Sequence, residues 1–133
     1  MFKLFASAIT LSLFTLLSAC GGGSDTTAGN GVAAYAGHYV GTVTGVTSAA
    51  DSGTFEVTVD SSGKITGTTI VKSLPWTLSG TVDANGVLNM GLYSGSFHGH
   101  NWVGSIKANG AFSGTWSHAN GDGVNGTFAG SKG

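Results

Sequence analysis

The chain has 133 residues, of which 24 are glycine and one is cysteine, and five basic residues against six acidic ones give a net charge of −1. All five basic residues are lysines, so the chain has neither the basic stripe of a nucleic-acid-binding protein nor the arginines of a typical phosphate clamp. We therefore expect no nucleic-acid partner and, from the length, one small domain.

The first nineteen residues have the features of a secretory signal. Met1-Phe2-Lys3 is a short positive start, and residues 4–17 are apolar except for four hydroxyl side chains. This apolar segment is shorter than the roughly 20 residues that span a bilayer, and it is typical of the central part of a signal peptide. We predict a signal peptide over residues 1–19.

The end of this segment, Leu17-Ser18-Ala19-Cys20, resembles the lipobox of bacterial lipoproteins. The resemblance implies cleavage before Cys20, a diacylglycerol on its thiol and an acylated amino group. Acylated Cys20 would then anchor the protein to its partner, the membrane. Gly21 in place of the aspartate of inner-membrane lipoproteins favours the outer membrane. The alternative is an ordinary signal peptide followed by a stray cysteine, which is unusual in an oxidising compartment.

Residues 20–34 predict a flexible tether after the lipidated cysteine, because they are almost all Gly, Ser, Thr, Ala and Asn. Two or more acyl chains hold a protein stably on a membrane without a spanning helix. We therefore expect a lipoprotein of the bacterial cell envelope, periplasmic or surface-exposed, with its folded domain over residues 35–133.

The folded part alternates apolar and polar residues with a period of two, and turn residues interrupt it. Gly63, Gly86 and Gly110 recur at spacings of 23 and 24 in similar four-residue turns, so the repeating unit is one hairpin. If the first and last strands pair, no edge stays open, which predicts an all-β, eight-stranded antiparallel up-and-down barrel; the alternative is a flattened β-sandwich. The expected strands are 37–45, 53–60, 64–71, 75–82, 87–93, 98–107, 111–118 and 123–130.

One face of the predicted strands is apolar and the other is mainly Thr, Ser, Asn, Lys and Glu. A membrane-spanning barrel has the opposite polarity and longer strands, so we expect this one to lie in water. Six strands carry a glycine on the apolar face, which either relieves crowding in a filled interior or leaves a cavity; the filled interior is favoured. The inner Gly-Thr pairs, such as Gly67-Thr68 and Gly80-Thr81, resemble lipocalin-like and avidin-like barrels and the small barrels of surface lipoproteins, but match no ligand motif.

The connections predict which end binds. The three tight turns lie at the end where the tether enters, and the longer connections 46–52, 72–74, 94–97 and 119–122 lie at the other, membrane-distal end. Loops on a rigid scaffold carry most binding residues, and the mouth of a barrel is a frequent ligand site.

Two candidate sites fall at this distal mouth. The spacing of His98, His100 and His118 predicts three imidazoles on the inner face. Together they could bind Zn²⁺ or Cu²⁺, or one of them could ligate haem. The alternative is that they are rim residues facing water. The second candidate site is a set of aromatic residues at the mouth: Trp76, Tyr93, Trp102 and Trp116. They could contact a small ligand or a protein partner; the alternative is that they fill the core.

No catalytic motif is present, so we expect a binding module rather than an enzyme. The alternatives are a structural surface lipoprotein with a filled core and no specific ligand, and a histidine-based metal-binding protein.

Overall fold

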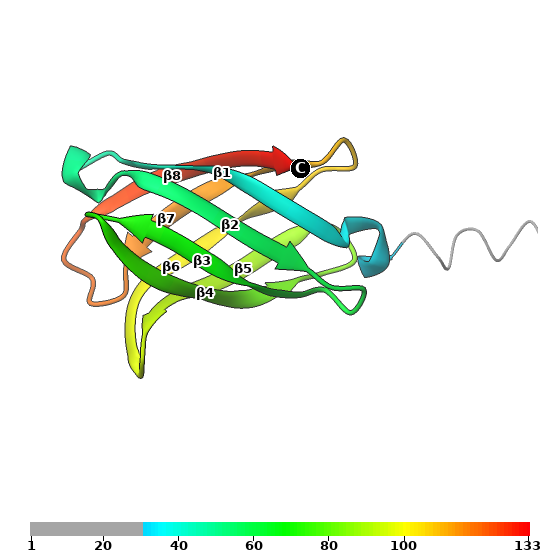
Figure 1. Ribbon diagram of the computed structural model, residues 1–133, viewed down its shortest axis with the longest axis horizontal. Coiled ribbons are helices and arrows are strands. Elements are labelled where there is room, and N and C mark those ends of the chain that lie inside the picture. Colours follow the sequence, from blue (N-terminus) through cyan, green and yellow to red (C-terminus); the bar gives the residue numbers. More distant parts are fainter. Residues whose placement is uncertain (1–30) are drawn as a thin grey trace, which may run out of the picture.

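The computed structural model describes residues 31–133, which form a closed barrel of eight antiparallel strands in which each strand pairs with the next and β8 pairs with β1 (Figure 1). The predicted fold class is therefore confirmed. The strands are β1 (Gly37–Gly45), β2 (Gly53–Val59), β3 (Lys64–Val71), β4 (Leu74–Val82), β5 (Val87–Ser94), β6 (Phe97–Ile106), β7 (Ala111–His118) and β8 (Asn125–Lys132).

The three tight turns explain how the repeat builds the barrel. Gly63, Gly86 and Gly110 have φ angles of 84°, 80° and 84°, a left-handed conformation that favours glycine. The carbonyl of each glycine also accepts a hydrogen bond from a backbone N–H at the end of the strand that follows its hairpin. The pairs are Val82 to Gly63 (2.8 Å), Ile106 to Gly86 (2.8 Å) and Lys132 to Gly110 (3.0 Å). The repeated turn thus fastens each hairpin to the next one around the ring.

The interior is filled by side chains. Seventeen hydrophobic residues are buried, and large aromatic rings pack against one another across the barrel, as at Phe55 and Phe112 (ring centroids 5.2 Å apart) and at Trp102 and Phe128 (4.7 Å). The inner glycines lie under these rings and strands: a Cβ at Gly114 would lie 2.6 Å from the Gly104 Cα and 2.7 Å from the Phe128 ring. The glycines therefore allow close packing and do not open a cavity.

The tight-turn end is closed by a short segment expected to belong to the tether. The 3-10 helix η2 (Val32–Tyr35) packs Val32 and Tyr35 against the core, and the carbonyl of Tyr35 accepts a hydrogen bond from the Tyr39 hydroxyl (2.8 Å). The folded domain therefore begins before residue 35. The predicted signal peptide, Cys20 and the rest of the tether lie outside the described residues.

The opposite end differs from the prediction in its connections. Residues 46–52 contain the 3-10 helix η3 (Ala49–Asp51), whereas β3 and β4 are joined by two residues, Lys72 and Ser73, because Val71 pairs with Leu74. Ser94 likewise pairs with Phe97, so the strands of the β5–β6 hairpin extend further than expected. This hairpin (yellow in Figure 1) bends away from the barrel body.

No helix within residues 31–133 is long and apolar enough to cross a membrane.

Candidate functional site

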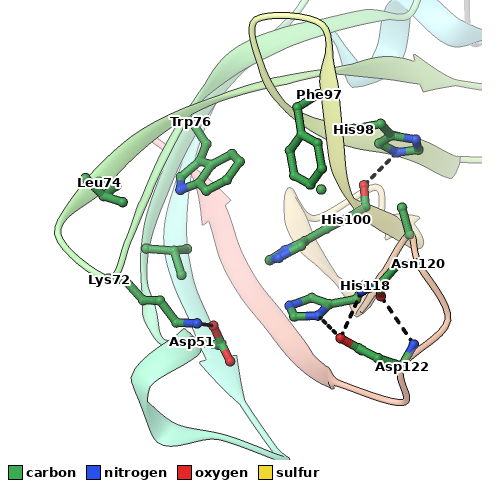
Figure 2. Close-up of a pocket in the computed structure, with 13 residues that line it drawn as sticks. Asp51, Lys72, Leu74, Trp76, Phe97, His98, His100, His118, Asn120 and Asp122 are labelled. Carbon is green, nitrogen blue, oxygen red and sulfur yellow. Dashed lines mark hydrogen bonds and ion pairs between the residues drawn. The ribbon is translucent and has the colours of Figure 1, made fainter.

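A pocket of about 440 Å³ opens at the mouth opposite the tight turns. Trp76 on β4 and Phe97 on β6 form an apolar wall, and His100, His118 and the 119–122 loop form a polar one (Figure 2). Its volume lies in the range of small-molecule sites. The predicted location of the binding site at this mouth thus coincides with a real concavity.

A β-bulge in β6 decides which side chains enter the pocket. Leu92 pairs with His100 and Tyr93 pairs with His98, so Gly99 is the extra residue of β6 in this register. Because one added residue reverses the alternation of faces, the His98 ring turns toward Tyr93, away from His100 and His118, and Phe97 also lines the pocket. The Gly99 carbonyl accepts a hydrogen bond from Ala119 N–H (2.9 Å), which ties the 119–122 loop to the bulge.

The three predicted histidines therefore do not converge. The exposed His98 ring stacks on Tyr93 (centroids 4.8 Å apart) and its Nε2 hydrogen-bonds the His100 carbonyl (2.9 Å). The rings of His100 and His118 do meet, with centroids 4.7 Å apart and planes 29° apart. Stacked rings direct their nitrogen lone pairs alongside each other rather than toward a common point, and no group of three or more His, Cys, Asp or Glu residues within 31–133 is placed to hold a metal ion. The expected three-histidine metal site is not formed.

His100 is the floor of the pocket. It is 7% exposed and packs against both Trp116 (centroids 4.7 Å apart, planes 9° apart) and His118, which also contact each other (6.0 Å). Burial, followed by the neighbouring His118, lowers the pKa of His100 to about 4, so its imidazole is neutral at neutral pH. Its Nδ1 is buried and has no hydrogen-bond partner among the residues that the structure describes.

Two carboxylates flank this floor. Asp51 of η3 has a buried carboxylate, 5% exposed, whose Oδ1 lies 2.7 Å from the Nζ of Lys72. Asp122 accepts a hydrogen bond from His118 Nδ1 (2.9 Å), and mainly for that reason the pKa of Asp122 is lowered to about 2. Both aspartates line the pocket.

The predicted aromatic set divides in three. Trp76 is half-buried and lines the pocket, 6.4 Å from His100 in a near-parallel arrangement (22°). Trp102 and Trp116 are 0% and 1% exposed and belong to the packed core, so they cannot contact a ligand directly. Tyr93 faces outward beside His98. Phe97, Asp51, Lys72 and Asp122 were missing from the predicted site.

These features define a closed β-barrel with a filled interior and a mixed aromatic and polar pocket at one mouth. No protein-family model matches the chain, and no curated protein sequence matches it.

Proposed function

We propose that this protein is a binding module of the bacterial cell envelope that captures a small molecule in the pocket at the open mouth of its barrel. The observation that carries the proposal is the contrast between the two ends of one core. The tight-turn end is covered by η2, whereas the other end leaves half-buried Trp76 and exposed Phe97 facing two buried polar groups, Asp51 and His100.

Buried polar groups beside an apolar wall are typical of small-molecule sites, in which a few polar groups orient a ligand that the wall desolvates. The backbone at the pocket supports this interpretation. Lys72 and Ser73 have φ angles of 53° and 60°, which non-glycine residues rarely adopt and which cluster at functional sites. The unfavourable conformation places the Lys72 ammonium on the buried Asp51.

The proposal includes an anchor at Cys20, supported by the lipobox-like sequence that ends there. Val32 lies at the tight-turn end, opposite the pocket, so a membrane anchor upstream of it would direct the pocket away from the membrane.

A fragment screen of the purified protein by saturation-transfer-difference NMR tests ligand binding. We expect fragments that bind the unmodified protein and lose about fivefold in affinity with Phe97→Ser, since an aromatic contact contributes about 1 kcal/mol. Phe97 is 63% exposed, so its replacement should leave the fold intact. Val103→Ser, on the outer face of the same strand and 49% exposed, is the matched control.

If no fragment distinguishes Phe97→Ser from Val103→Ser, small-ligand capture is excluded. The protein would then be a structural surface barrel or would act through protein contacts.

A further inference from the structure

The tautomer of His118 is set by its neighbour. The Oδ2 of Asp122 lies 2.9 Å from the Nδ1 of His118 and also accepts from Asn120 Nδ2 (3.1 Å), while Oδ1 accepts from Val124 N–H (2.9 Å). Three donor contacts of this kind hold a carboxylate that is ionised at neutral pH, and an ionised carboxylate only accepts. In the neutral form of the His118 imidazole the proton is therefore on Nδ1, which leaves Nε2 as an acceptor.

The polar wall of the pocket consequently includes hydrogen-bond acceptors. Besides His118 Nε2 it includes the second carboxylate oxygen of Asp51, whose Oδ1 is paired with Lys72. Lys72 Nζ contacts Asp51 Oδ1, and Figure 2 shows His118 lying between Asp122 and the cavity. A molecule that enters can satisfy these acceptors only with an N–H or O–H group.

The remaining walls are flat. The ring planes of Trp76 and His100 are 22° apart, and those of His100 and His118 are 29° apart, so the His100 ring is near-parallel to the neighbouring ring in each pair. Phe97 is tilted by 49° against Trp76 and closes the outer side. Flat aromatic rings pack best in offset-stacked or edge-to-face arrangements against such walls.

We infer that the pocket selects a planar ring compound carrying an N–H or O–H donor, that His118 Nε2 receives this donor, and that Asp122 is the positioning residue that keeps Nε2 unprotonated. This inference rests on the proposed small-molecule function and adds the chemical class of the ligand.

Indole and 1-methylindole are the test, because they share one planar ring system and differ in the single N–H donor. We expect NMR titration of the purified protein to show indole binding about tenfold more tightly than 1-methylindole, the value of one hydrogen bond of about 1.4 kcal/mol. Asp122→Asn should remove this preference, since the asparagine amide can donate to Nδ1 and move the His118 proton to Nε2.

The ¹⁵N chemical shifts of His118 report this change of tautomer independently of any ligand. Asp60→Asn, which alters an aspartate in a turn at the opposite end, is the control and should leave the preference and the tautomer unchanged.

Equal affinity for the two probes, or no binding of either, would overturn the inference about ligand class, while the fragment screen decides separately whether the pocket binds small molecules. An unchanged tautomer and preference in Asp122→Asn would overturn the positioning role of Asp122.

Discussion

At position 100 an imidazole is packed against an indole and a second imidazole in the floor of the pocket. A histidine with a pKa of about 4 in the folded protein takes up a proton more readily when the chain unfolds, where the pKa is 6.5. Lys72 and His118 disfavour its protonation, and Asp51 and Asp122 favour it more weakly than burial opposes it.

We therefore predict that acid destabilises the protein partly through His100. The stabilisation from its low pKa is complete above pH 6.5 and is lost as the pH falls toward 4, because in this window only the unfolded chain binds the proton. Urea unfolding should show that the difference in unfolding free energy between the unmodified protein and His100→Gln falls by about 2 kcal/mol between pH 7 and pH 4.5, once solvent screening is allowed for. A difference that does not change with pH would contradict this prediction.

Among the elements, the turn between β3 and β4 combines a strained backbone with a functional side chain. A two-residue hairpin turn with positive φ at both positions is usually formed by residues such as Asn-Gly, but here it is formed by Lys72 and Ser73. Lys72 pairs with Asp51, whereas the described structure gives Ser73 no comparable role.

Replacing Ser73 with glycine should therefore stabilise the fold. The left-handed conformation costs an L-residue about 1–2 kcal/mol, partly offset by the larger backbone entropy of unfolded glycine, so we expect a gain of about 0.5–1 kcal/mol in thermal or urea unfolding. Ser62→Gly is the opposite control: the Ser62 hydroxyl donates to Asp60 (2.6 Å), so that variant should be destabilised. A loss of stability in Ser73→Gly would show that the strain is not relieved.

The elements also show what the sequence could and could not predict. The alternating pattern and the three glycine turns determine the strands, their faces and the closure of the ring, because burial enforces a period of two and each turn fixes a register. The bulge at Gly99 was not predictable: Phe97 to His100 alternates normally in sequence, and only the pairing with Leu92 and Tyr93 shows the added residue.

Interactions between distant segments were equally inaccessible. The pairing of Asp51 with Lys72 joins η3 to the turn after β3, and no local pattern marks it. The last strand was expected at 123–130 and lies at Asn125–Lys132. Its start could not be predicted, because the segment before it is rich in Gly, Asn and Asp and has no apolar alternation that could set a boundary.

For the whole molecule, the proposed anchor leads to a simple prediction. If Cys20 carries the lipid, Cys20→Ser should block cleavage before residue 20 and remove the lipid. The variant should then either remain an unprocessed precursor or, if the signal is removed at another position, move from the membrane fraction of the producing bacterium to the soluble fraction. Fractionation with metabolic labelling by a palmitate analogue measures both effects. A Cys20→Ser protein that is still labelled and processed as before would contradict the lipoprotein assignment.

The order of the strands gives the ring a single seam. Seven of its eight pairings join strands that follow one another in the chain, and only β1 with β8 joins the two ends of the domain. Hairpins can form early, since little chain entropy is lost in closing a short loop, whereas the seam can close only when nearly the whole domain has been ordered. Until then both edge strands expose unpaired backbone groups, so during biogenesis the β1 and β8 edges are the surfaces most in need of protection from pairing with another chain.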